Sequence, residues 1–256
     1  MTRPFYKTDA ITGGGPAQYI SAEHKLNEPW EEQAHNVKLV GHSDLNGWGD
    51  AFQIQVSKGI CYVAASGVNG HDGMTILDVK DPSKPTILNQ ISDSPGARTH
   101  KVLKINDDIM ITNSELRPNL RDKYPELKGG MKIFDISDPI NPKFLRYVET
   151  DGMGIHRPIY DRDRKLMYSS GYRDGFNKKI LLIHDMKDPS NPEFIGQGWV
   201  EGQKDGEEYS WDNSIVQNEA WCHEGNPWGN YVTAGWWDGG IVLFDCSDPS
   251  KPEFKW

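Results

Sequence analysis

Short apolar runs recur along this chain, and each is followed within a few residues by an Asp-Pro pair. The runs cover residues 74–76, 131–133, 180–182 and 241–243, and the pairs begin at Asp81, Asp138, Asp188 and Asp248, with spacings of 57, 50 and 60 residues. Near-alternation of apolar and polar positions with β-branched side chains predicts a strand. Because Asp accepts a backbone N–H and Pro presets φ, each pair predicts a turn directly after its strand.

Two further strands are predicted before each run and one after it. The nearer set covers 60–67, 109–115, 166–171 and 230–235, and the farther set covers 51–59, 100–108, 156–163 and 220–225. A fourth strand follows the second Pro of each motif, as at 142–148. Four antiparallel strands in a repeat of about 50 to 60 residues are typical of a propeller blade. The predicted fold class is all-β, a β-propeller of four-stranded antiparallel blades, in which stacked blades bury the faces that one blade leaves bare.

Composition supports this fold and excludes several functions. The chain has 36% hydrophobic residues with 26 Gly and 16 Pro, a mixture that suits turn-rich β structure. Its net charge is −9 and no basic stripe is present, so nucleic acid is excluded as a partner. No apolar run is long enough for a membrane span. The first residues lack the apolar core of a signal peptide, and three cysteines form no disulfide framework, so a cytoplasmic location is expected.

Two copies of the motif are specific enough to suggest a family. The stretches GGMKIFDISDPINPKFL, from Gly129, and GGIVLFDCSDPSKPEF, from Gly239, resemble the LVIVD repeat, and the resemblance extends over about residues 37–256. It implies a β-propeller and leaves the activity open. The architecture and histidine placement are also similar to those of selenium-binding, methanethiol oxidase-like propellers, by analogy only. Residues 1–36 are expected to form an extended N-terminal arm.

The last residues, 253–256, fall inside the fourth strand of the last repeat. Two arrangements are open. The four blades can form a complete ring closed by a lone strand at 36–42, or they can belong to a larger, seven-bladed ring, with the propeller incomplete at the C-terminus. We favour the larger ring, because a blade face left bare would be an aggregation hazard. A homo-oligomer or a second chain completing the propeller is therefore an expected partner.

Three histidines open the innermost strands of successive repeats: His100, His156 and His223. Residues at equivalent positions are related by rotation about the propeller axis, so their side chains are expected to converge. Three imidazoles suit a transition metal such as Zn, Cu, Fe, Ni or Mn, with a position open for substrate. The first repeat has Asp50 or Gln53 there instead. The alternative is that the imidazoles fill the channel and bond to neighbouring blades.

Loops between the second and third strands are expected to wall this mouth. The predicted substrate-binding residues are Glu115, Arg117, Tyr172, Arg173, Trp236 and Trp237, and the predicted catalytic residues are Glu224 and Arg157. Arginine beside aromatic side chains suits a small anionic or aromatic molecule. The predicted function is a metal-dependent enzyme, an oxidoreductase or lyase, acting on a small polar or anionic substrate. The alternative is a non-catalytic propeller that binds a protein or ligand on this face.

Overall fold

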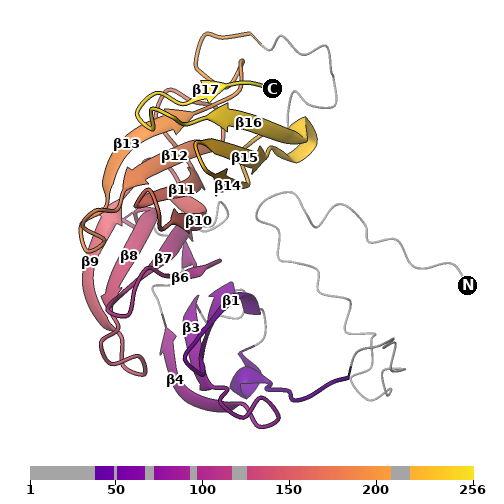
Figure 1. The fold of residues 1–256 in the computed structure, drawn as a ribbon, viewed down its shortest axis with the longest axis vertical. Helices are drawn as coiled ribbons and strands as arrows, with labels where there is room; N and C mark the ends of the chain where they lie inside the picture. Colours follow the sequence, from indigo (N-terminus) through magenta and orange to yellow (C-terminus); the bar gives the residue numbers. More distant parts are fainter. Residues whose placement is uncertain (1–37, 49–50, 67–71, 93–96, 117–125, 209–219) are drawn as a thin grey trace, which may run out of the picture.

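The structure, a computed structural model, describes residues 38–48, 51–66, 72–92, 97–116, 126–208 and 220–256. Four antiparallel sheets follow one another along an arc, with the strands of each sheet in chain order (Figure 1). Blade 1 consists of β1 (Ala51–Ser57), β2 (Ile60–Ser66), β3 (Asp72–Asp78) and β4 (Thr86–Ser92). Blade 3 consists of β10 (Ile155–Asp161), β11 (Leu166–Gly171), β12 (Ile180–Asp185) and β13 (Glu193–Gly198).

Blades 2 and 4 follow the same plan with local changes. Blade 4 consists of β14 (Glu224–Trp228), β15 (Tyr231–Gly235), β16 (Ile241–Asp245) and β17 (Glu253–Phe254). In blade 2 the inner strand is broken into β5 (Ala97–Arg98) and β6 (Val102–Lys104), both paired with β7 (Ile109–Leu116). The blade continues with β8 (Gly130–Asp135) and β9 (Lys143–Glu149). We call the four strand positions of every blade a, b, c and d, from the innermost outward.

The predicted all-β propeller fold is confirmed, and the predicted strands match the observed ones closely. All four apolar runs lie in c strands, and all four Asp-Pro pairs lie in c–d turns. Three predicted strands were wrong in their bounds. The described residues 38–42 form no strand, and of the predicted inner strand 100–108 of blade 2 only Val102–Lys104 forms one. The a strand of blade 4 begins at Glu224 rather than at residue 220, because Glu224 is the first residue to pair with β15, opposite Gly235.

The hydrophobic core lies in the seams between blades. The first seam contains Tyr62 and Ile76 of blade 1 with Met110 of blade 2. The next seam joins Ile133 of blade 2 to Leu182 of blade 3. The b and c strands of blades 1 to 3 are buried on both faces, whereas β15 and β16 of blade 4 alternate between buried and exposed positions. Fully burying side chains of this size contributes roughly 1.5–3 kcal/mol each, which makes blade stacking the main source of stability.

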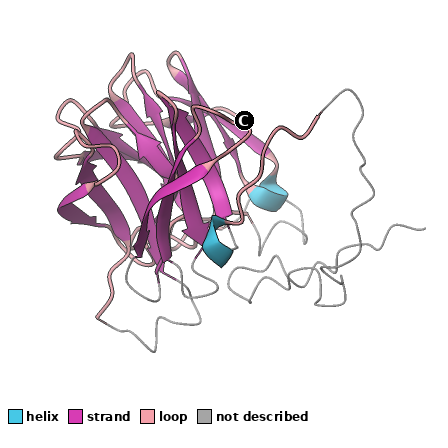
Figure 2. Ribbon diagram, turned by 90° about the horizontal axis from the view of Figure 1, so that it is seen from below, coloured by secondary structure: helices cyan, strands magenta, loops and turns pink. Residues whose placement is uncertain are grey.

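The two ends of the strands differ in construction (Figure 2). We call the end with the a–b and c–d turns the c–d end, and the end with the b–c loops and the a-strand starts the b–c end. At the c–d end, each Asp-Pro turn is closed by its own side chain. The Asp81 carboxylate, for example, accepts hydrogen bonds from the N–H and hydroxyl of Ser83, at 3.0 and 2.6 Å. Hydrogen bonds from Ser83 hold the pKa of Asp81 below its ordinary value.

Each blade also holds the c–d turn of the blade that follows. The Tyr62 hydroxyl of blade 1 donates to the carbonyl of Pro139 in blade 2, at 3.1 Å. Arg146 of blade 2 donates to Asn191 of blade 3. Arg164 of blade 3 donates to the carbonyl of Cys246 in blade 4, at 2.7 Å. The repeated turn is therefore both a local closure and a docking point between blades.

Within the described residues, no helix has the length and apolar character needed to cross a bilayer. Two short 3-10 turns of the described residues, Leu45–Gly47 and Trp237–Gly239, lie at the b–c end (Figure 2).

Candidate functional site

A row of aromatic rings crosses the b–c end where the a strands begin. The centroids of His100 and His156 are 4.2 Å apart, and those of His156 and His223 are 5.1 Å apart. Phe52 stacks on His100 at 4.1 Å, and Trp237 lies edge-on to His223 at 5.5 Å. The structure therefore brings the three predicted histidines together. Blade 1 contributes Phe52 to this row.

The other residues expected from blade 1 have different positions. Asp50 lies outside the described residues. The backbone N–H of Gln53 donates to the carbonyl of His100, at 3.3 Å, and its side-chain oxygen is buried without a hydrogen-bond partner. A register shift between Ala51 and Ile54 places Phe52 and Gln53 in an irregular part of β1.

The backbone around His100 is held by a side chain instead of a strand ladder. His100 lies in the break between β5 and β6, and the Oδ1 atom of Asn113 accepts the N–H groups of His100 and Lys101, both at 2.9 Å. The Nδ2 atom of the same Asn113 donates to the carbonyl of Ile155, at 3.1 Å. Ile155 directly precedes His156. One buried amide therefore positions the backbone of two histidines from different blades.

His156 begins β10 beside an irregularity that also positions Arg157. The pairing register of β10 shifts between His156 and Ile159, and Arg157 has φ +44°, a conformation that non-glycine residues rarely adopt. Bulges of this kind redirect side chains next to functional sites. Here the bulge allows the adjacent residues His156 and Arg157 to serve one site, whereas neighbours on a regular strand point to opposite faces.

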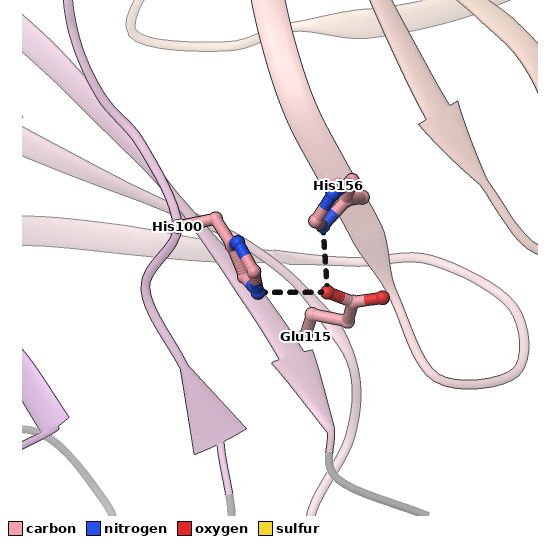
Figure 3. Close-up of side chains that lie close together, drawn as sticks. All are labelled: His100, Glu115 and His156. Atoms are coloured by element: carbon pink, nitrogen blue, oxygen red, sulfur yellow. Dashed lines mark hydrogen bonds and ion pairs between the residues drawn. The ribbon is translucent and has the colours of Figure 1, made fainter. Parts of the chain in front are cut away.

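A buried carboxylate, Glu115, lies beside His100 and His156 (Figure 3). Its Oε2 atom is 2.8 Å from Nδ1 of His156 and 3.6 Å from Nε2 of His100. Its remaining partners are Arg98, with Nε 3.0 Å from Oε2, and Lys179, with Nζ 3.2 Å from Oε1. Glu115 is 2% exposed, so its charge is removed from water and depends on these partners.

The electrostatics keep Glu115 ionised and the imidazoles neutral. Burial alone would raise the pKa of Glu115, but His156, Lys179 and Arg98 outweigh it and hold the pKa well below the ordinary value. Burial lowers the pKa of His156, against the opposing effect of Glu115. Burial, and the positive charge that a protonated His156 would carry, lower the pKa of His100 well below its ordinary value. Burial, with Arg157 and His156, lowers that of His223 to about 4.

These charges determine the tautomer of His156. An ionised carboxylate can only accept a hydrogen bond, so the Nδ1 atom of neutral His156 carries the proton that faces Glu115. The lone pair of His156 is then at Nε2. Both ring nitrogens of His100 are buried without a hydrogen-bond partner. Two neutral imidazoles with available lone pairs are what a transition metal requires.

A rim of charged, half-buried side chains surrounds the histidines. The two oxygens of Glu224 face Lys101, at 3.1 Å, and Arg157, at 3.5 Å. The Nε atom of Arg157 is buried without a hydrogen-bond partner. The predicted catalytic pair, Glu224 and Arg157, therefore lies beside the histidine row.

The predicted substrate-binding residues divide into two groups. Glu115 lies at the centre of the site. Burial, with a smaller contribution from the charge of Glu115, raises the pKa of Tyr172. Trp237 closes one end of the ring row and is 37% exposed.

Two of the other predicted residues, Trp236 and Arg173, have their contacts elsewhere. Trp236 is fully buried in the seam between blades 3 and 4, where its Nε1 atom donates to Gln203 at 3.1 Å. Arg173 pairs with Asp151 at 3.3 Å and lies over the ring of Phe194. Their partners explain both positions: the indole of Trp236 packs in the core, and the guanidinium of Arg173 lies at the outer edge of blade 3. Arg117 lies outside the described residues.

Several site residues escaped prediction: Phe52, Arg98, Lys101, Asn113 and Lys179. Asn113 was the easiest to find, because it lies in a polar run, Thr112–Glu115, within a predicted strand, where buried polar side chains need partners. Arg98 and Lys179 carry no comparable local signal. Lys179 is 7% exposed, and within the described part of the chain its ion pair is with Glu115, which is 64 residues away in sequence.

Cavity volume alone does not mark this site. A cavity of about 240 Å³ is lined by Ala97, Ser114 and Leu116, together with residues of β8 and β9. These residues alternate along their strands with Arg98 and Glu115, so the cavity lies on the opposite face of the sheet. A second hollow, of about 560 Å³, lies near His42 and Thr86. Neither cavity is lined by the three histidines. We therefore assign the site from its buried charges and unpaired nitrogens.

The buried group His100, Glu115 and His156 can hold a metal ion. One ligand-type atom from each residue lies within 4.8 Å of the others. Imidazole and carboxylate together suit several first-row transition metals, so the donor set leaves the metal open. Two observations fit an ion here: the unpaired nitrogens of His100, and the neutral state of both imidazoles. The nearby Arg98 and Lys179 act against it, since they already occupy both oxygens of Glu115.

The stacked four-stranded sheets define the chain as a β-propeller protein. The LVIVD repeat model matches two parts of the chain: residues 48–92, which contain blade 1, and residues 228–256, which contain most of blade 4. The resemblance predicted from the Asp-Pro motifs is thereby confirmed. None of the curated proteins matches the chain.

Solved structures with this architecture are distant in sequence. A candidate 6-phosphogluconolactonase from Bacteroides uniformis is similar over 80% of this chain, with 13% identity and a TM-score of 0.55. A hypothetical selenium-binding protein from Sulfolobus tokodaii is similar over 80%, with 11% identity and a TM-score of 0.52. The Dos1 propeller is similar over 79%, with 15% identity and a TM-score of 0.50. The likeness covers 53%, 48% and 46% of those chains, so this chain spans about half of their length. At these identities it shows the fold alone.

Proposed function

We propose that this protein is a metal-dependent enzyme that acts on a small polar or anionic molecule at the b–c end of its propeller. The observation that carries the proposal is the row of three neutral imidazoles, in which Glu115 fixes the tautomer of His156. Metal-bound histidines commonly donate their other ring N–H to a carboxylate, which orients the ring and raises its basicity. Glu115 holds the Nδ1–H of His156 in that way.

In this proposal the metal ligands are His100, His156 and His223, and Glu115 orients His156. A bound metal ion would supply Lewis-acid chemistry or a water of lowered pKa. Residues of the chain itself would bind the substrate and transfer protons. Arg157 and Lys101 attract and orient the substrate, and Glu224 is placed to accept or return a proton at its carboxylate oxygens. The reaction class, oxidoreductase or lyase, stays open.

Glu115 itself is the competing third ligand. It belongs to the group whose ligand-type atoms lie within 4.8 Å, whereas His223 does not. Against this role stand Arg98 and Lys179, which would have to yield a carboxylate oxygen to the ion. His223 carries no such competitor among the ion pairs of the described residues.

Metal analysis of the purified protein tests this proposal. We expect about one transition-metal ion per chain after growth with added Zn, Cu, Fe and Mn, measured by plasma mass spectrometry. His223→Ala should reduce metal affinity at least about 100-fold if His223 is a ligand, since loss of an orienting partner alone costs 10–100-fold. His184→Phe is the matched control, because His184 lies in β12 against Phe194 and outside the ring row.

The outcomes separate the alternatives. Full metal content in His223→Ala, with loss in Glu115→Gln, would make Glu115 the third ligand. Absence of metal from the wild-type protein under all growth conditions would remove the enzyme proposal. The same face would then be a non-catalytic binding surface, because its buried charges would remain.

A further inference from the structure

We infer that the ligand of this site is a small carboxylate with a planar body, bound by the guanidinium of Arg157 with the ammonium of Lys101. The inference deepens the proposed function and rests on it for the identity of the site. It depends on three observations, which are the charge balance, the donors of Arg157 and the aromatic ends of the histidine row.

The first observation is an excess of positive charge. The ion pairs of this site involve four cationic side chains, Arg98, Lys101, Arg157 and Lys179, and two carboxylates, Glu115 and Glu224. Without counting any imidazole, these ion pairs leave two uncompensated positive charges in a chain whose net charge is −9. A divalent metal would add two more. Charges in such a partly buried position interact strongly, so an anion from outside is the natural counter-charge.

The second observation is the donor geometry of Arg157. Its Nε atom is buried without a hydrogen-bond partner, and its Nη1 atom is 3.5 Å from Glu224, too far for a good hydrogen bond. A guanidinium with a free Nε and a loosely held Nη matches the two oxygens of a carboxylate. The positive φ of Arg157 shows that the backbone adopts an unfavourable conformation to place this residue here.

The third observation concerns the ends of the ring row. Phe52 closes one end and Trp237 the other, and they are 39% and 37% exposed. Trp221 packs edge-on to Trp237 at 5.3 Å, and its Nε1 atom is buried without a hydrogen-bond partner. Exposed aromatic faces beside a charged centre favour a flat, unsaturated ligand over a bulky aliphatic one.

Binding of the carboxylate and the metal should be coupled. Because the anion compensates the charge that a metal ion adds, each should raise the affinity of the site for the other by the same factor. This reciprocity gives the inference a readout that does not require knowledge of the reaction.

Titration calorimetry with benzoate as the probe tests the inference, with cyclohexanecarboxylate as the non-planar control. We expect benzoate to bind more tightly than cyclohexanecarboxylate. Arg157→Gln should weaken benzoate binding about 10- to 100-fold, the value of a charged hydrogen bond. Arg157→Lys keeps the positive charge and loses the paired N–H donors, so its benzoate affinity should lie between that of the wild type and that of Arg157→Gln. Arg162→Gln, at an exposed arginine in the β10–β11 turn, should bind as the wild type does.

Thermal unfolding of each variant shows whether it is folded, and Lys101→Met provides a second variant away from the bulge. Equal benzoate affinity in the wild type, Arg157→Gln and Lys101→Met would overturn the inference. So would equal affinity for benzoate and cyclohexanecarboxylate. Metal uptake without any carboxylate binding would overturn it while leaving the metal proposal intact. Arg157-dependent benzoate binding in a protein that takes up no metal would support the carboxylate site and remove the metal.

Discussion

The c–d end and the b–c end of this propeller are built from the same four repeats, yet they use polar residues in different ways. At the c–d end, each Asp-Pro turn satisfies itself with neighbours two or three residues away, as Asp138 does with Ile140 and Asn141. At the b–c end, Glu115 is satisfied by Arg98, His156 and Lys179, from two blades and at separations of 17 to 64 residues. The hydrogen bonds that close the turns repeat with the sequence, whereas the buried charge network around Glu115 occurs once among the described residues.

The difference shows which end can bear a function. Each Asp-Pro turn is exposed, and its Asp carboxylate already accepts hydrogen bonds within the turn, so a ligand there would satisfy no unpaired group. The b–c network is buried, has an excess of positive charge and contains unpaired nitrogens on His100, Arg157 and Trp221. Unpaired buried polar atoms are costly in a folded protein and mark the place where a ligand would be stabilising.

The largest expected effect comes from removing the central charge of the b–c end. Glu115→Gln leaves Arg98 and Lys179 without their buried counter-charge, so we expect it to lower the free energy of unfolding by about 3–5 kcal/mol. Urea unfolding followed by circular dichroism measures this. Glu149→Gln, at an exposed position on β9, is the control and should change little. A Glu115→Gln protein as stable as the wild type would show that the network is not what holds this end together.

A smaller, pH-dependent effect is expected from a buried imidazole at the opposite end. Burial, with a contribution from Arg173, lowers the pKa of His184 from 6.5 to about 4. Between these pH values the unfolded chain binds a proton that the folded protein does not, so stability falls as the pH falls through this range. The loss attributable to His184 is about 3 kcal/mol at pH 4.

His184→Phe should remove that share of the pH dependence. Its unfolding free energy, measured in urea from pH 7 to pH 4, should decrease less steeply than that of the wild type. An unchanged slope would assign the pH dependence to the histidines of the b–c end, of which His223 also has a pKa lowered to about 4.

The smallest effect concerns a single contact between a blade and the next c–d turn. Tyr62→Phe removes the hydroxyl that donates to the Pro139 carbonyl, and we expect a loss of about 1 kcal/mol, the usual net value of one neutral hydrogen bond. Tyr231→Phe, on the exposed side of β15, is the control. A loss above about 3 kcal/mol would mean that the turns contribute more to blade stacking than the apolar seams suggest.

The same distinction between local and long-range contacts explains what could be predicted from the sequence. The strands were predictable because their side-chain alternation repeats four times, and the c–d turns because Asp and Pro act within a few residues. His100, His156 and His223 were found because they occupy one position in successive repeats. Glu115 was found as a loop residue, but its central place was not, since its partners are brought to it only by blade stacking. Arg98 and Lys179 escaped prediction for a similar reason, since only the fold brings them to Glu115.

The break in the inner strand of blade 2 has a consequence for which substitutions the protein can accept in evolution. At His100 the chain is held by the side chain of Asn113, which also holds the backbone before His156. A residue at position 100 can therefore be exchanged without altering any strand pairing, so its chemistry can vary while the fold persists. Asn113, in contrast, is constrained, because a substitution there would disturb the backbone at both His100 and His156. Among related propellers, we would look for variation at the equivalent of position 100 only where an amide is retained at the equivalent of position 113.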